Sequence, residues 1–223
     1  MTAAKPAPTL VTCSSARSET STVPSRPRTR ALKIDRVTTP TSKDPDEEIT
    51  IDSRVAFSGR LLTVRTDRVR LPDGRETDRE IVVHRGAVAI VAIDTERRVL
   101  LVRQYRKAAE ASLLEIPAGT LEPGEEPLAC AERELIEETG QRAAKLERIC
   151  GFYTAPGFCT EFLHVFAARD LSPAHAEADA DERIEVVRLP FEQCLRLVRS
   201  GEIRDAKSIV GLLAVEVGWG GMP

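Results

Sequence analysis

The sequence predicts an α/β fold, namely an α/β/α sandwich with a mixed sheet, preceded by a small antiparallel β subdomain. Residues 86–94 are almost wholly apolar, as in a strand buried on both faces of a sheet. A helical pattern begins at Pro127, because proline is favoured at the first helical position. Before residue 86 lie β-branched segments that flank Asp73-Gly74, a dipeptide typical of hairpins.

The order of expected elements follows from these patterns. Strands are expected at residues 49–51, 55–70 and 77–84, then at 86–94, 99–106 and 113–117, and after the helix at 144–153, 161–168 and 182–189. A polar turn joins the strands at 95–98, and residues 154–157 and 171–181 are expected to be loops. Two more helices are expected, one from near Pro190 and one with Asp205 as its N-cap.

The length and the local composition of the chain predict how it divides into domains. The chain has 223 residues, 42% hydrophobic and 30% charged, which is enough for one sizeable core. Residues 1–47 are rich in Ser, Thr, Pro, Ala and Arg and are expected to form a disordered tail, or to follow a start codon placed too early. The expected units are then a β subdomain at 48–84, a main domain at 85–217 and a C-terminal tail at 218–223.

The net charge, the hydropathy and the cysteines indicate which classes of partner and which cellular compartment to expect. A net charge of -3 gives no electrostatic reason to expect nucleic acid as a partner. No apolar run approaches the roughly 18 residues that a membrane span requires, so no membrane partner is expected. The five cysteines include no C-x-x-C pair, which favours free thiols in a reducing cytoplasm over disulfides or a zinc site.

The helix that begins at Pro127 carries an acidic cluster. Glu134, Glu137 and Glu138 stand at i, i+3 and i+4, so their carboxylates project from one side. Such like charges are stabilised by a cation, either Arg133 or a bound divalent metal. Hard carboxylate oxygens prefer Mg²⁺ or Mn²⁺. The alternative is a plain solvated face, as most charge runs are.

The other side of this helix is expected to be buried. Leu128, Ala131 and Leu135 repeat there at helical spacing. Cys130 is expected to be a small core residue rather than a metal ligand, because a soft thiolate and hard oxygens prefer different metals.

Residues 119–140 resemble the Nudix box, G-x5-E-x7-R-E-U-x-E-E-x-G-U, where U is a bulky apolar residue. The final position departs, since Gln141 stands where an apolar residue is usual. The matching positions are Gly119, Glu125, Arg133, Glu134, Leu135, Glu137, Glu138 and Gly140.

The resemblance implies metal-dependent hydrolysis of a nucleoside diphosphate linked to another group. It implies Glu134, Glu138 and the backbone carbonyl of Ala118 as metal ligands. Glu137 is implied either as a catalytic, metal-binding group or as a structural partner of Arg133, and Glu125 as a salt-bridge partner of that arginine.

Four further segments are similar to the ADP-ribose pyrophosphatase branch of this superfamily. These are LLEIPAGTLEPGE, FYTAPGFCTE, ERIEVVRLPFEQ and SGEIRDAKSI. The resemblance implies Mg²⁺, or Mn²⁺ as a substitute, and hydrolysis of ADP-ribose to AMP and ribose 5-phosphate. It also implies a homodimer formed through the N-terminal β subdomain.

The same resemblance implies a set of substrate contacts. Arg106 would contact phosphate or ribose, since a guanidinium fork suits that role; the alternative is a surface-strand arginine. Glu161 would accept a hydrogen bond from the terminal ribose; the alternative is a solvated acid. Phe152, Tyr153 and Phe158 would pack on adenine or fill the core. Backbone groups of Thr120, Ala155, Pro156 and Gly157 would complete the pocket.

The catalytic base is less directly indicated. Related enzymes carry a glutamate two positions before an aligned metal-ligand glutamate. Glu182 matches the ligand position, but Ala180 stands where the base is usual. The candidates are therefore Glu182, then Asp181, then Asp179.

Two other functions remain open at this point. One is hydrolysis of another ADP-sugar, a GDP-sugar or an oxidised nucleotide. The other is a sensor that binds ADP-ribose without cleaving it, which Ala180 would fit. The intact acidic cluster favours an enzyme.

Overall fold

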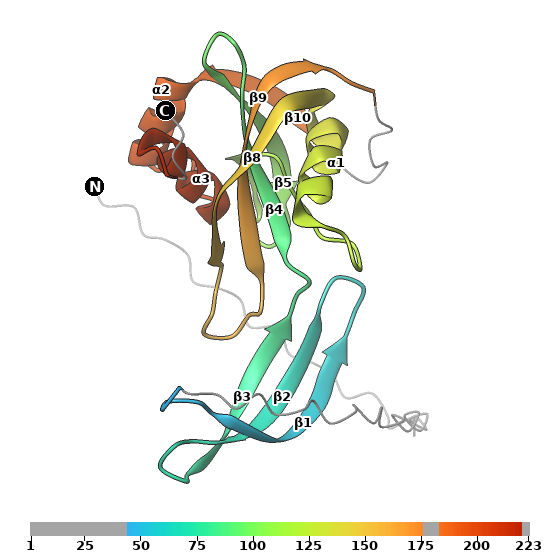
Figure 1. The fold of residues 1–223 in the computed structure, drawn as a ribbon, viewed down its shortest axis with the longest axis vertical. Helices are drawn as coiled ribbons and strands as arrows, with labels where there is room; N and C mark the ends of the chain where they lie inside the picture. The colour runs from blue at the N-terminus through green and yellow to red at the C-terminus, as the bar shows by residue number, and fades with distance from the viewer. Residues whose placement is uncertain (1–43, 176–182, 220–223) are drawn as a thin grey trace, which may run out of the picture. The chain divides into compact units, whose positions relative to one another are not determined.

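The computed structural model describes residues 44–175 and 183–219. Their first sheet has three antiparallel strands in the order β1-β2-β3 (Figure 1). The strands are β1 (Ile49–Ser58), β2 (Thr63–Arg70) and β3 (Glu76–Val83). The hairpin expected at Asp73-Gly74 is confirmed, because β2 pairs with β3 and Gly74 has a φ of 85°. The predicted tail lies outside the described residues except for residues 44–47.

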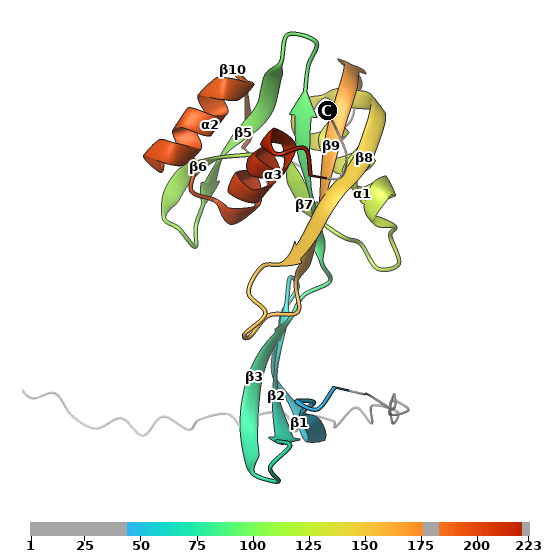
Figure 2. The same ribbon diagram turned by 60° about the vertical axis from the view of Figure 1, so that its left-hand side comes forward.

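The second sheet is mixed and has seven strands. Its order is β10-β5-β4-β9-β8, with β6 paired to β5 and β7 paired to β4 (Figure 2). The β4–β9 pair is parallel and all other pairs are antiparallel. The strands are β4 (Ala87–Ile93), β5 (Arg98–Arg106), β6 (Ala111–Glu115), β7 (Ala118–Thr120), β8 (Gln141–Tyr153), β9 (Phe162–Pro173) and β10 (Glu185–Pro190).

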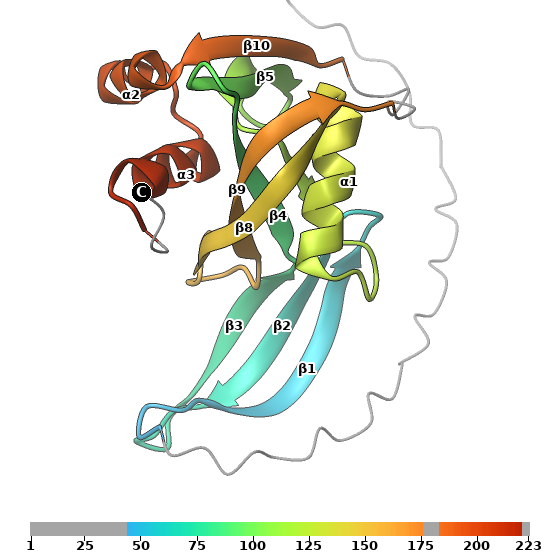
Figure 3. The ribbon, with the colours of Figure 1, turned by 45° about the horizontal axis from the view of Figure 1, so that its top comes forward.

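Helices cover both faces of this mixed sheet. Helix α1 (Pro127–Thr139) lies on one face, and α2 (Phe191–Ser200) and α3 (Ala206–Glu216) lie on the other (Figure 3). Strand β4 supplies both cores, because alternate side chains point to opposite faces. Ala89 and Val91 pack with α2 and α3, whereas Val88 and Ile90 pack with α1. The predicted α/β/α sandwich is confirmed.

Three expectations about the elements are wrong. The strand expected at 55–70 is broken at Gly59, whose N–H donates to Leu62 O in a turn, so β1 and β2 are separate strands. Residues 171–173, expected in a loop, belong to β9 because they pair with residues 141–143 of β8. Leu128 is 48% exposed, since the buried side of α1 carries Cys130 with Ala131 and Leu135.

Strand β3 is hydrogen-bonded to the loop between β8 and β9. The Val82 N–H donates to Phe158 O at 2.7 Å, and the Thr160 N–H donates to Val82 O at 3.0 Å. Thr160 Oγ1 also accepts from the His84 N–H at 2.9 Å. The last strand of the small sheet therefore fixes the conformation of the loop at residues 154–161.

The four cysteines within residues 44–175 and 183–219 are free thiols, and the fifth, Cys13, lies outside that part. Burial raises the pKa of the Cys130 thiol to about 12, so it stays protonated and behaves as a core side chain, as expected.

None of the helices in the described ranges has the length and apolar character that spanning a membrane requires.

Candidate active site

Helix α1, which carries the acidic cluster, begins and ends at residues that favour a helix boundary. Pro127 occupies the start of the helix, and Gly140 ends it in a left-handed conformation with a φ of 65°. The Gly140 N–H donates to Ile136 O at 2.8 Å, which satisfies one of the carbonyls that a helix end leaves free. Glu134, Glu137 and Glu138 thus lie on the last turns of a rigid rod.

Arg133 connects three of the acidic residues. Its Nε and Nη2 bind the two carboxylate oxygens of Glu125 at 2.9 and 3.0 Å, and its Nη1 contacts Glu134 at 2.7 Å and Glu137 at 2.9 Å. The bidentate bond from Arg133 lowers the pKa of Glu125 to about 2, and the same bonds raise the pKa of Arg133. The expected pairing of Arg133 with Glu125 and Glu137 is therefore present, and it joins the turn before α1 to the helix itself.

The Arg133–Glu125 pair predicts an acid-sensitive contribution to stability. The folded pKa of Glu125 is about 2, below the unfolded value of about 4.3, so the pair stabilises the fold above the unfolded pKa. Glu125→Gln is expected to lower the free energy of unfolding by on the order of 2 kcal/mol at pH 7. The difference from wild type should shrink as the pH falls from about 4.3 to about 2, measured by urea unfolding. Glu132→Gln, at an exposed position on α1, is the control; a constant difference across that pH range would contradict the assignment.

Strand β7 places backbone groups directly against the acidic cluster. The Ala118 N–H donates to Glu138 Oε2 at 3.0 Å, and β7 pairs with β4 through Ala118, Gly119 and Thr120. A Cβ on Gly119 would lie 1.8 Å from Cδ of Glu134, so only glycine permits the carboxylate to sit there. Gly119 is thus the middle residue of this short strand.

The donor set fits a hard divalent cation. Glu134, Glu137 and Glu138 offer carboxylate oxygens, and the Ala118 N–H of β7 bonds to Glu138, so β7 lies beside these carboxylates. Within residues 44–175 and 183–219, there is no cluster of three or more His, Cys, Asp or Glu side chains already arranged to hold a metal ion. In this arrangement, Arg133 bonds one oxygen of Glu134 and one of Glu137. The candidate ligand Glu182 lies outside that part of the chain.

A cavity of about 310 Å³ lies on the other side of β7. Its wall combines β4, β5, β7, the loop before β9 and the start of α3 (lining residues Ala87, Arg106, Ala118, Gly119, Thr120, Thr154, Glu161, Leu163, Asp205, Ala206 and Lys207). A larger hollow of about 550 Å³ lies between β10, β6 and α2, but none of its lining residues comes from α1 or β7.

The structure brings together three of the six residues expected to bind substrate. Arg106, Thr120 and Glu161 line the cavity beside β7, whereas Ala155 and the two residues after it, Pro156 and Gly157, do not. Glu161 accepts a hydrogen bond from Thr154 Oγ1 at 2.6 Å and lies 3.3 Å from His84 Nδ1.

Arg106 is already engaged by a buried carboxylate. Its Nε and Nη2 form a fork on Glu115, with distances of 3.0 and 2.8 Å to the two oxygens, and Glu115 is 1% exposed. Lys207 Nζ contacts the same carboxylate at 2.5 Å. Glu115 and Lys207 were not among the residues expected from sequence, although the segments LLEIPAGTLEPGE and SGEIRDAKSI contain them. Asp205 was expected only as a helix N-cap, a role that the structure confirms.

Comparison with known proteins decides the family. Residues 83–209 match the family described as NUDIX domain, and residues 48–82 match the nucleoside diphosphate sugar hydrolase N-terminal domain. The chain belongs to the Nudix family. The resemblance based on the acidic helix is thereby confirmed, and the acidic helix, its arginine and β7 form the Nudix box of this hydrolase.

This Nudix hydrolase is similar in sequence to several known proteins and in structure to a solved hydrolase. It is 48% identical to the ADP-ribose pyrophosphatase of Bacillus subtilis (strain 168), over 73% of this chain and 89% of the relative. It is 42% identical to the methanol dehydrogenase activator of Bacillus methanolicus, over 74% and 91%. It is 40% identical to the GDP-mannose pyrophosphatase of Salmonella paratyphi B, over 56% and 70%. A crystal structure of an ADP compounds hydrolase matches with a TM-score of 0.71 and 27% identity, covering 81% of this chain and 98% of that one.

Two groups of expected Nudix site residues do not line the cavity in the part of the chain that the structure describes. The candidate bases Asp179, Asp181 and Glu182 lie outside the described residues. The aromatic side chains of Tyr153 and Phe158 are both 58% exposed, so they do not fill the core.

Proposed function

We propose that this Nudix hydrolase cleaves the pyrophosphate bond of ADP-ribose, or of a related ADP-sugar, to give AMP and ribose 5-phosphate. The observation that carries the proposal is the 48% identity to an ADP-ribose pyrophosphatase over 89% of that protein. The cavity beside β7 supports it, because Arg106 lines this cavity together with Ala118, whose N–H bonds to Glu138 of the Nudix box. The guanidinium of Arg106 is suited to a substrate with two phosphates.

Each residue of the site has a proposed role. The guanidinium of Arg106 binds a phosphate or the adjacent ribose, and backbone groups of Thr120 orient the substrate along β7. Glu161 accepts a hydrogen bond from the terminal ribose. Backbone groups of the turn of Ala155, Pro156 and Gly157 contact the part of the substrate that extends beyond the cavity wall.

The proposed metal is Mg²⁺, with Mn²⁺ as a substitute. Glu134, Glu138, the carbonyl oxygen of Ala118 and Glu182 would hold it. When bound, it would neutralise the diphosphate charge and favour attack of water on phosphorus. Arg133 keeps Glu134 and Glu137 in place through its Nη1 contacts.

The proposed proton acceptor is an acid of the segment before β10. Glu182 is ranked first, followed by Asp181 and Asp179, and Glu137 of α1 is the candidate outside that segment. A carboxylate in this position takes the proton of the attacking water.

A GDP-sugar is the second candidate substrate. The observation that favours it is the 40% identity to a GDP-mannose pyrophosphatase, although that match spans 56% of this chain. The two candidates share the diphosphate and differ in the base and the sugar.

One experiment distinguishes these substrates. Purified protein is incubated with Mg²⁺ and, separately, ADP-ribose, ADP-glucose, GDP-mannose and NADH, and release of AMP or GMP is measured. The proposal expects the highest kcat/KM for ADP-ribose. Higher kcat/KM for GDP-mannose would support the second candidate, and ADP-ribose binding without any turnover would contradict both.

We also propose that residues 48–84 form a dimerisation subdomain for a catalytic domain at 85–217, and that the enzyme works in the cytoplasm, as the free thiols suggest. The dimer proposal is supported by β1, a strand whose ten residues are all exposed. Large apolar side chains are among them, and an apolar edge strand favours pairing with another chain. They are Ile49, Ile51, Val55 and Phe57.

The dimer proposal makes a direct prediction. Phe57→Glu places a charge on this apolar strand and is expected to convert dimers to monomers, measured by sedimentation velocity. Arg54→Glu, at another exposed position of β1, is the control for a change of charge alone. Wild-type protein that sediments as a monomer at micromolar concentration would rule out the proposal.

A further inference from the structure

The carboxylate of Glu115 lies buried between two cations at the edge of the substrate cavity. Arg106 holds it with a two-bond fork, and Lys207 Nζ approaches the same Oε2 at 2.5 Å. Burial alone would raise the pKa of Glu115, but Arg106 and Lys207 bring it below its ordinary value. Glu115 is therefore ionised, and its charge must be balanced by cations.

Lys207 reaches Glu115 because the first turn of α3 is fixed against the end of β6. Asp205 caps the helix by accepting from the Ser208 N–H at 3.0 Å, and it also accepts from Lys207 Nζ at 3.0 Å. Ser208 Oγ accepts from the Ile116 N–H at 2.8 Å. These bonds hold Lys207 in one place, and its side chain is 14% exposed.

The two cations differ in their surroundings. Both residues line the substrate cavity, but the side chain of Arg106 is 37% exposed, whereas that of Lys207 is 14% exposed and is bonded to two carboxylates. A phosphate that enters the cavity competes with Glu115 for Arg106. Since an unpaired buried carboxylate is costly, Arg106 can share its charge with substrate only if another cation stays on Glu115.

We propose that Lys207 is a positioning residue, which pairs with Glu115 and thereby holds the Arg106 guanidinium where it binds the substrate diphosphate. This inference rests on the proposed function of Arg106. Lys207 acts through Glu115 rather than by touching substrate. It therefore sets the affinity for an anionic substrate more than the rate of bond cleavage.

The test is a double-mutant cycle on the full chain. Lys207→Met is expected to raise the KM for the substrate that the wild type prefers by about tenfold, with kcat changed by less than about threefold. In an Arg106→Met background, adding Lys207→Met should raise KM by less than about twofold, because the guanidinium that Lys207 positions is already gone. Lys207→Arg, which retains the charge, should recover most of the lost affinity.

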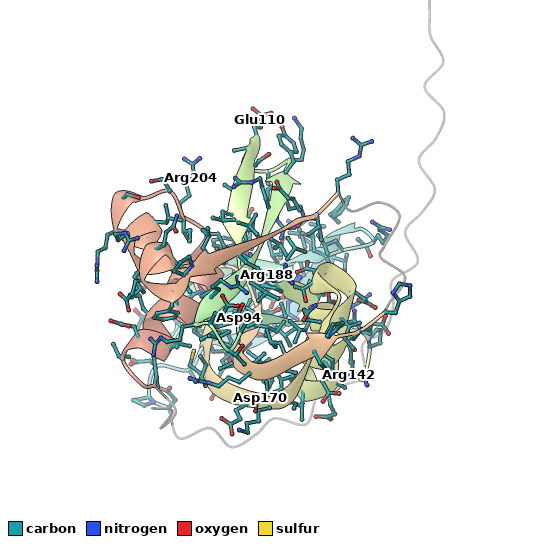
Figure 4. The ribbon with its side chains drawn as sticks, turned by 90° about the horizontal axis from the view of Figure 1, so that it is seen from above. Asp94, Glu110, Arg142, Asp170, Arg188 and Arg204 are labelled. Atoms are coloured by element: carbon teal, nitrogen blue, oxygen red, sulfur yellow. The ribbon has the colours of Figure 1, made fainter. Side chains whose placement is uncertain are left out.

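Lys107→Met is the matched control. Lys107 directly follows β5 and carries the same charge as Lys207, but it pairs with Glu110, which lies at the periphery of the molecule in Figure 4. The side chain of Lys107 is 83% exposed, so its removal should leave KM within about twofold of wild type. An effect of Lys107→Met equal to that of Lys207→Met would overturn the proposal in favour of a general field effect.

The remaining outcomes also decide the question. Additive effects of Lys207→Met and Arg106→Met would mean that Lys207 contacts substrate itself, which overturns the proposal. A lower melting temperature with unchanged KM would leave Lys207 a structural role alone and would overturn it as well. If Lys207→Met does not fold, Lys207→Gln, which keeps an N–H donor for Glu115, takes its place in the cycle. Failure of the wild type to hydrolyse any substrate would count against the proposed function, not against this inference.

Discussion

Glu138→Gln is expected to abolish turnover while leaving the fold intact. Glu138 is 7% exposed and accepts a hydrogen bond from the Ala118 N–H, so it stands where α1 meets β7. Glutamine has the same shape and keeps an oxygen that accepts this bond, but it removes the charge that a divalent cation requires. A metal contributes several kcal/mol to the transition state, so kcat should fall by about 10³-fold or more.

Two measurements accompany the rate. Mn²⁺ binding, followed by electron paramagnetic resonance, should weaken together with kcat, whereas the melting temperature should stay near that of wild type. Glu132→Gln, at an exposed position on the same helix, should change neither property. An unchanged rate and Mn²⁺ affinity in Glu138→Gln would remove Glu138 from the metal site.

Gly119→Ala is expected to have the next largest effect, although it adds only one methyl group. The new Cβ would lie 1.8 Å from Cδ and 1.9 Å from Oε1 of Glu134, far inside van der Waals contact. Either the Glu134 side chain leaves its position or β7 shifts away from β4. Both changes separate the carboxylate from Ala118, so kcat/KM should fall by about 10²-fold.

The cause of that loss can be isolated with a second variant. If Gly119→Ala acts through Glu134, then adding it to Glu134→Gln should cost little more than Glu134→Gln alone, measured as kcat/KM. Mn²⁺ affinity should fall to a similar extent in all three variants. Multiplicative losses would instead mean that the methyl group disturbs the substrate cavity directly.

The local chemistry of the Nudix box could be predicted from sequence. Proline at a helix start, glycine at its end and the i, i+4 pair of Arg133 and Glu137 are short-range features, and the structure has all three. Helical periodicity predicts on which side of the helix a side chain lies, but it does not predict whether the sheet extends far enough to cover that side chain. For that reason Leu128 was expected to be buried, although it lies in the first turn and is exposed.

The parts that could not be predicted depend on partners distant in the chain. Lys207 and Glu115 are 92 positions apart and meet only because α3 begins beside the end of β6. Residues 171–173 have little strand propensity of their own, yet they extend β9 because β8 supplies a partner. Likewise Ala118, Gly119 and Thr120 form a strand because β4 presents an edge to them.

The hydrogen bonds between β3 and the loop at residues 154–161 have a thermodynamic consequence. Val82 and His84 hold this loop at its Phe158–Thr160 part, and Thr154 and Glu161 of the same loop line the substrate cavity. A partner that binds the small sheet and a substrate that fills the cavity would therefore both act on the loop at residues 154–161. If the two events differ in the loop conformation they favour, each must change the affinity of the other by the same factor. If the chain dimerises through this sheet as proposed, its association constant and its affinity for substrate are then linked quantities, and each must be measured at more than one protein concentration.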